Sequence, residues 1–166
     1  MLVVTTLRIL VLGFGDPTQG NEGIGGRLAR SLFASFDDVE VRPASDFKGF
    51  SEILHDYDFV VILKSLSYCG NMGHVSLGSE YGLADGWGIH PARTEDFANA
   101  LEYARLMGHS IPRIEVVNVC VGSEEWPERG LSPTVASMYR GILGRVRAVV
   151  KDVIRDAKRA ANSPPE

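Results

Sequence analysis

Three residues of this sequence have side chains suited to catalysis or metal binding. Glu22 comes soon after the run at 8–13, Lys64 directly follows the run at 59–63, and His90 stands in a glycine-rich stretch. A carboxylate and an imidazole can act together as general acid and base, or bind a metal ion. Taken singly, Glu22 and His90 are better explained by structural roles, as an acid at the N-terminus of a helix and a loop histidine. The residues alone predict an α/β domain with a Glu/His site.

Three other chemistries receive less support. Gly13 and Gly15 suggest a dinucleotide-binding loop, but Thr18 stands where the third glycine of G-x-G-x-x-G belongs. Cys69 could be a reactive thiol, although no neighbouring pattern favours it. The serines at 65 and 67 lack the G-x-S-x-G setting of a hydrolase nucleophile.

The elements that would position these residues alternate between strand and helix. Strands are expected at 8–13, 39–41, 59–63, 74–77 and 114–121, because each is a short apolar or alternating run. Helices are expected to begin after the N-caps Asn21, Thr94 and Ser132, with another short helix at 50–54. This order predicts three layers: a mostly parallel, twisted sheet of about five strands with helices on both faces. In such a sheet, function gathers at the carboxyl ends of the strands.

Composition narrows the class of protein. The 166 residues fit one domain over 1–166, with residues 1–7 and 160–166 expected to be disordered. The net charge of −4 argues against nucleic acid as a partner. No apolar run approaches the ~20 residues of a membrane span, and the start lacks the pattern of a secretory signal. Two cysteines do not form a disulfide framework. We therefore expect a cytoplasmic protein, whose oligomeric state the sequence does not indicate.

Four segments, in order and spacing, resemble the nickel–iron hydrogenase maturation endopeptidases. The segment at 9–17 is similar to the family's opening strand and G-x-G-N-x-L loop, and 20–25 to its D-[DE]-G-x-G turn. Ile89-His90 resembles the histidine segment, and 130–135 the G-L-[ST]-P-T-V helix start. The resemblance implies an aspartic-type endopeptidase that removes the C-terminal peptide of a hydrogenase large subunit precursor after metal insertion. Nickel, carried by the substrate, is the only metal it implies.

The resemblance also implies a site, from which this sequence departs. Two family ligands fall on Glu22 and His90, which are the expected catalytic and metal-facing residues. The remaining ligand, an aspartate, falls on Lys64, and a charged lysine has no lone pair for a cation. We expect its ammonium near Glu22, as an internal ion pair. Asn21 and Asp16 also differ from the family pattern, and Asp16 or Cys69 could supply a substitute ligand.

Three functions remain open. The first is a working maturation endopeptidase that uses Glu22 and His90. The second is a catalytically degenerate relative that binds a hydrogenase subunit as an accessory or chaperone-like protein. The third, from analogy of fold only, is an unrelated small hydrolase or nucleotide-binding protein.

Overall fold

The fold is built around a five-stranded sheet in the order β2-β1-β3-β5-β4. The computed structural model describes residues 6–16, 18, 20–45, 50–67, 69–79, 91–122 and 129–164. The strands are β1 (Ile9–Phe14), β2 (Val39–Ala44), β3 (Phe59–Leu66), β4 (Val75–Ser79) and β5 (Arg113–Cys120). The helices are α1 (Ile24–Ser31), α2 (Phe50–Leu54), α4 (Pro91–Leu106) and α5 (Pro133–Ala161), and the 3-10 turn η1 (Gly20–Gly23) precedes α1. The predicted α/β architecture is confirmed.

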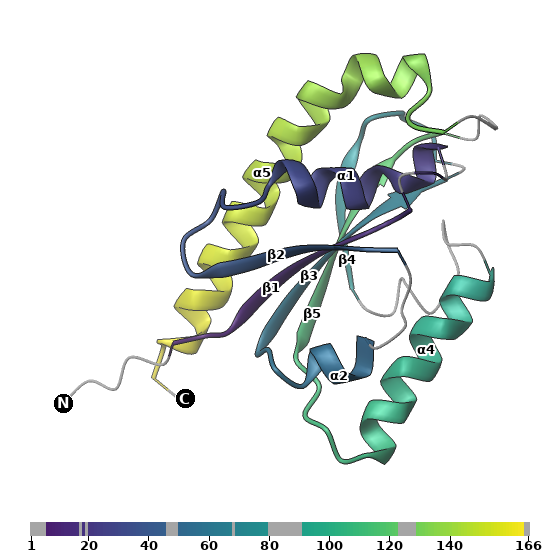
Figure 1. Cartoon of the computed structure of the whole chain (residues 1–166). Helices are drawn as coiled ribbons and strands as arrows, with labels where there is room; N and C mark the ends of the chain where they lie inside the picture. The colour runs from purple at the N-terminus through teal and green to yellow at the C-terminus, as the bar shows by residue number, and fades with distance from the viewer. Residues whose placement is uncertain are drawn as a thin grey trace.

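Helices cover both faces of the sheet. Figure 1 shows the sheet nearly edge-on, with α1 and α5 on one side and α2 and α4 on the other. Strand residues alternate between the two faces, because successive side chains of a strand point in opposite directions. The core on the α1/α5 side includes Ile9, Val11, Val61, Leu63, Val117 and Val119. The core on the α2/α4 side includes Leu10, Leu12, Val60, Ile62, Ile114 and Val116.

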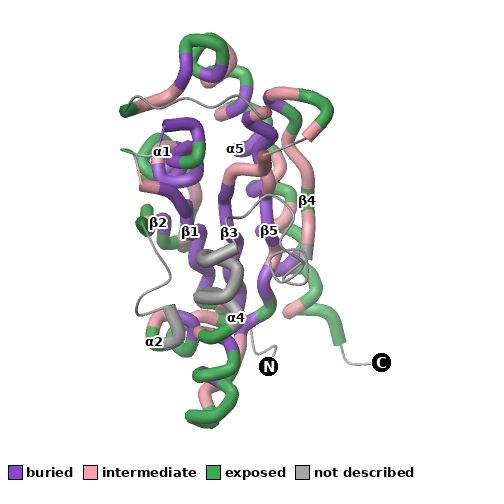
Figure 2. Tube along the Cα trace, turned by 90° about the vertical axis from the view of Figure 1, so that its right-hand side faces the viewer, coloured by how far each residue is buried: buried purple, intermediate pink, exposed green. Residues whose placement is uncertain are grey.

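The central strands are the most buried part of the chain. β1 is buried along its whole length, and β3 is buried from Phe59 to Lys64. In Figure 2 these strands and much of β5 are purple, whereas the edge strand β4 is pink and green. β1 pairs in parallel with β2 and β3, and β3 with β5, while β4 is antiparallel to β5. The expectation of an edge strand after residue 73 is therefore confirmed, as is the continuous apolar character of buried parallel strands.

Glycine allows α1 to lie very close to the sheet. A Cβ on Gly25 would lie 2.1 Å from the carbonyl oxygen of Phe14 and 2.5 Å from that of Leu63. These are backbone atoms, so they cannot move aside as the end of a flexible side chain would. The close approach brings η1 and α1 against the carboxyl ends of β1 and β3.

Two predicted helix caps are wrong. α1 begins at Ile24 after η1, and its N-cap is Gly23, without a side-chain cap bond. Asn21 is instead buried and hydrogen-bonded to a distant segment, which explains why it caps nothing. α4 begins at Pro91, so Thr94 lies inside the helix. The cap at Ser132 is confirmed, since its hydroxyl oxygen accepts a bond from the N–H of Val135 at 3.3 Å.

Element ends differ from the predictions in ways that matter for the site. β3 continues to Leu66, which places Lys64 inside the strand rather than in the loop after it. α5 continues to Ala161, so residues 160 and 161 of the expected disordered end are helical. Residues 1–5 of the expected disordered start lie outside the described residues. No helix within the described residues is long and apolar enough to cross a membrane.

Candidate functional site

The carboxyl edge of the parallel strands gathers η1, the end of β3 and the end of β5. Register pairs Lys64 with Asn118 on β5, and residues of η1 contact β3. This is the edge at which α/β proteins bind ligands, as the sequence predicts.

Glu22 lies on a turn that is anchored to the rest of the fold. Its side chain is exposed, whereas its neighbours Asn21 and Gly23 in η1 are buried. Asn21 accepts a hydrogen bond from the N–H of Ser132 at 2.8 Å and donates one to the Ser132 hydroxyl at 3.1 Å. These bonds join η1 to the first turn of α5. The turn that presents Glu22 is therefore held in place by α5.

Lys64 is the most unusual group at this edge. Its side chain is only 6% exposed, and burial lowers its pKa from 10.5 to about 8. Within the described residues no ion pair joins it to Glu22, so the expected internal pair is not formed there. Lys64 lies in the sheet because β3 extends through it, and no acidic partner among the described residues pairs with its amino group.

His90 lies outside the described residues. The residue after it, Pro91, is the first of α4. The structure therefore neither joins His90 to Glu22 nor separates them, and its role stays a prediction.

Asp16 and Cys69, which the sequence suggested as substitute ligands, have other bonding partners. One carboxylate oxygen of Asp16 accepts hydrogen bonds from the N–H and the hydroxyl of Thr18, both at 2.8 Å. This is an Asx turn that shapes the loop after β1. Cys69 forms a disulfide with Cys120, so the reactive thiol considered above is not free. Both cysteines lie near the carboxyl edge, and their pairing escaped prediction because 51 residues separate them.

The described side chains do not fit a divalent cation. Among them, no group of three or more His, Cys, Asp or Glu side chains is close enough to hold a metal ion. Lys64 adds a buried amino group at the position where the resemblance implies an aspartate ligand. A protonated amine repels a cation and offers it no lone pair.

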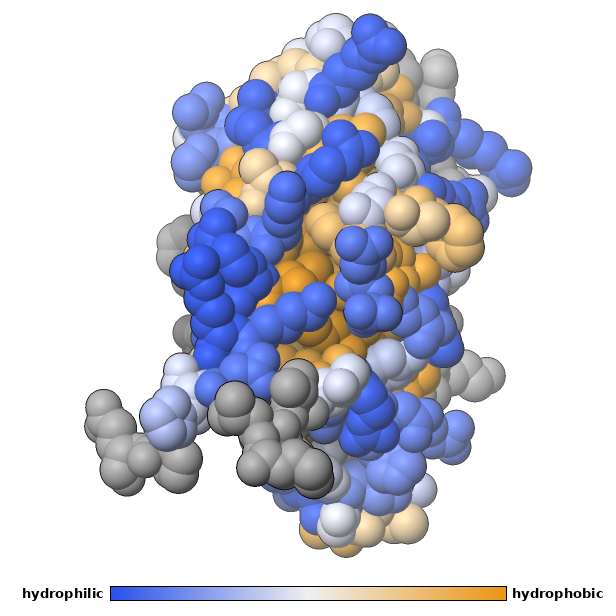
Figure 3. Space-filling model, turned by 90° about the vertical axis from the view of Figure 1, so that its left-hand side faces the viewer, coloured by the Kyte–Doolittle hydropathy of each residue, from blue (hydrophilic) through white to orange (hydrophobic). Residues whose placement is uncertain are grey.

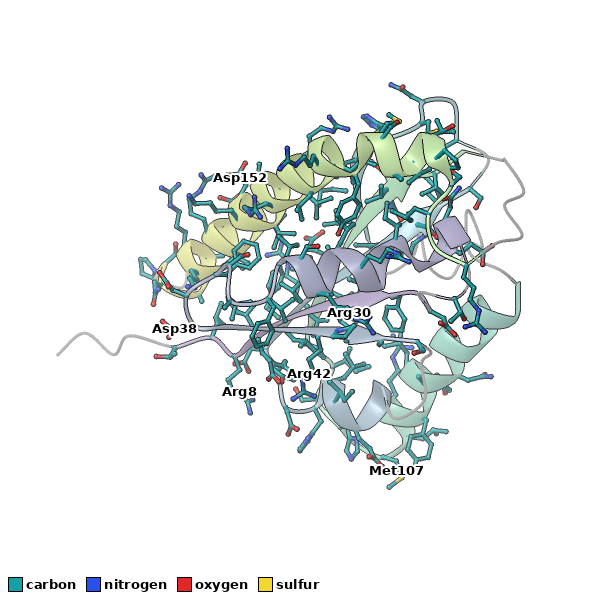
Figure 4. All side chains as sticks on the ribbon, turned by 45° about the horizontal axis from the view of Figure 1, so that its top comes forward. Arg8, Arg30, Asp38, Arg42, Met107 and Asp152 are labelled. Carbon is teal, nitrogen blue, oxygen red and sulfur yellow. A yellow bond between two sulfur atoms is a disulfide. The ribbon has the colours of Figure 1, made fainter. Side chains whose placement is uncertain are left out.

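A cluster of ionisable groups on the α2/α4 side of β2 was not predicted from the sequence. Glu40 accepts hydrogen bonds from the hydroxyl of Tyr57 and from Arg42. Burial and the bond to Glu40 raise the pKa of Tyr57 to about 12. Figure 4 labels Arg42 and, near it, Arg8, whose side chain pairs with Asp58. Only tertiary structure brings these residues together. Glu40 ties β2 to the segment before β3, and Arg8 ties the residue before β1 to the same segment.

One groove of the described residues lies away from the candidate site. It has a volume of about 890 Å³ and runs between residues 35–37 and the second half of α5. Figure 3 views the molecule from this side and shows an apolar floor between hydrophilic side chains. Since residues 35–37 precede β2, the groove is at the amino end of the sheet, whereas Glu22 and Lys64 lie at the carboxyl edge.

Comparisons with known proteins agree on the fold. No protein-family model matches the chain, and no curated protein matches its sequence. Among solved structures, the hydrogenase maturating endopeptidase HybD from E. coli is 23% identical, with a TM-score of 0.66 over 89% of this chain and 94% of that one. The [NiFe] hydrogenase maturation protease HycI from Thermococcus kodakarensis KOD1 is 15% identical, with a TM-score of 0.62 over 93% and 96%. The resemblance seen in the sequence is thus confirmed at the level of the fold.

Proposed function

We propose that this chain, which has the fold of the nickel–iron hydrogenase maturation endopeptidases, is itself a maturation endopeptidase. It would remove the C-terminal peptide of a hydrogenase large subunit precursor, in the cytoplasm. The observation that carries the proposal is that the likeness to HybD extends over 89% of this chain and 94% of the other. The likeness therefore includes nearly the whole length of both chains.

Glu22 and His90 are the proposed catalytic residues. Glu22 is exposed at the carboxyl edge on an anchored turn, where a substrate peptide can reach it. In the proposed reaction a water oxygen attacks the scissile carbonyl carbon while Glu22 takes a proton from that water. His90 gives a proton to the leaving nitrogen, and the C–N bond breaks. No step in this scheme requires a metal ion held by the protein.

A processing assay tests this function. A hydrogenase large subunit precursor is incubated with the wild type, Glu22→Gln or His90→Ala, and cleavage is followed by the loss in mass. We expect both substitutions to lower the rate at least 100-fold, since general acid–base catalysis typically contributes that much. Glu52→Gln and His55→Ala are matched controls, because both side chains are exposed on or beside α2. Unchanged processing in both site variants would refute the assignment.

A second function is favoured by the buried Lys64. The resemblance implies an aspartate metal ligand where this chain has the buried Lys64. This difference favours an accessory protein that binds the hydrogenase subunit without cleaving it. Stable binding of the precursor by the wild type, with no cleavage product in any condition, would select this function over the first.

A further inference from the structure

Three polar side chains form a row across the carboxyl edge of the sheet. Lys64 on β3 pairs in register with Asn118 on β5, which in turn pairs with Ser76 on β4. Lys64 follows Ile62 by two positions, and Asn118 follows Val116 by two, so both point to the α2/α4 side, as Ile62 and Val116 do. The apolar core on that side therefore ends at this row.

Two groups in the row have unmet bonding capacity. Lys64 is 94% buried, and within the described residues it has no hydrogen bond or ion pair. The Oδ1 of Asn118 is buried and has no hydrogen-bond partner there either. Buried ammonium groups and amide oxygens are costly unless a partner satisfies them. A donor with a positive charge and a neutral acceptor thus stand on adjacent strands.

The two groups together match the end of a polypeptide chain. A C-terminal residue carries a carboxylate, which accepts from an ammonium, and its own N–H, which donates to an amide oxygen. A divalent cation would satisfy the oxygen but be repelled by the ammonium. A simple anion would satisfy the ammonium and leave the oxygen unpaired.

We propose that Lys64 and Asn118 form a receptor for the C-terminal residue of a peptide. Lys64 pairs with its carboxylate, and the Oδ1 of Asn118 accepts from its N–H. Gly78 on β4 gives the Asn118 side chain its room, since a Cβ there would lie 3.2 Å from Nδ2. The choice of a protein C-terminus as occupant rests on the proposed function, in which the substrate is cut near that end.

Three small probes separate the parts of this receptor. N-acetylalanine has both the carboxylate and the N–H, N-acetylalaninamide lacks the charge, and acetate lacks the N–H. Binding is measured by calorimetry and by NMR of the Asn118 side-chain amide. We expect N-acetylalanine to bind at least tenfold more tightly than either of the others. Equal affinity for all three, or no binding of N-acetylalanine, would overturn the proposal.

Variants assign the effect to the two side chains. Lys64→Met should abolish the preference for N-acetylalanine over its amide, while Lys151→Met, an exposed lysine on α5, should keep it. Asn118→Leu should reduce the affinity for N-acetylalanine to that for acetate, and it provides a second test if Lys64→Met does not fold. Preference retained in Lys64→Met would contradict the receptor. No hydrogenase is present, so failure here leaves the processing assay to judge the function separately.

Discussion

Replacing Lys64 by methionine should stabilise the protein at neutral pH and lose this effect at high pH. Methionine has a similar length and no charge, so it suits a side chain that is 6% exposed. Burial lowers the lysine pKa from 10.5 to about 8 in the folded chain. At about 1.4 kcal/mol per pH unit, the charged form costs the folded state about 3 kcal/mol.

The direction of this pH dependence follows from the number of protons that the folded and unfolded chains bind. Below pH 8 both folded and unfolded chains hold the proton, so the whole cost is present. Between pH 8 and 10.5 the unfolded chain binds a proton that the folded chain does not, so wild-type stability rises with pH. The advantage of Lys64→Met should therefore be about 3 kcal/mol at pH 7, smaller at pH 8.5 and about 1 kcal/mol at pH 10.

Urea unfolding followed by circular dichroism measures this difference. Both proteins are unfolded at the same three pH values without reductant, so that the disulfide stays intact. Comparing the wild type with Lys64→Met cancels the contributions of other titrating groups to stability. One such group is Tyr57, whose raised pKa makes stability fall only above pH 10. Lys151→Met is the exposed control and should change stability by less than about 0.5 kcal/mol. An advantage that stays constant from pH 7 to 10, or grows, would refute the burial of an unpaired amino group.

Three further predictions concern the frame of the site. Asn21→Ala removes two buried hydrogen bonds to the start of α5 and should cost about 2–4 kcal/mol in urea unfolding, and a loss under 1 kcal/mol would contradict the anchoring role. Gly25→Ala should lower the free energy of unfolding by about 3 kcal/mol or more, because the new Cβ meets backbone oxygens. Gly144→Ala on α5, where a Cβ has nothing within 4 Å, should raise it by about 0.5–1 kcal/mol. Thermal unfolding compares the two variants, and equal effects would be inconsistent with the close approach of α1 to the sheet. The Cys69–Cys120 disulfide closes a loop across a sequence separation of 51 residues, so its reduction should cost about 4 kcal/mol, measured by unfolding with and without a phosphine reductant. No change would mean that the bond is not formed in solution.

The architecture could be predicted from the sequence because local patterns determine it. Buried parallel strands are short apolar runs, and the run at 59–63 identifies β3 without any knowledge of its partners. The cap at Ser132 could be predicted for the same reason, since its bond is to a residue three positions away. The boundaries depend on tertiary contacts, and β3 extends through Lys64 only because β5 pairs with it there.

The chemistry of the site was predicted only in part. Glu22 is at the expected edge, but the reason lies in the bonds of Asn21 to Ser132, 111 residues away. The expected Glu22–Lys64 pair failed because sequence spacing gives no information on how deeply a side chain is buried. The disulfide and the Glu40–Tyr57–Arg42 cluster likewise depend on contacts between distant segments.

A nickel titration of the wild type and Lys64→Asp tests the central claim most directly, namely that the buried Lys64 keeps cations from the carboxyl edge of the sheet. The account predicts no micromolar nickel binding by the wild type in calorimetry, and binding once an aspartate supplies the implied ligand. Micromolar binding by the wild type, as tight as that of Lys64→Asp, would contradict it.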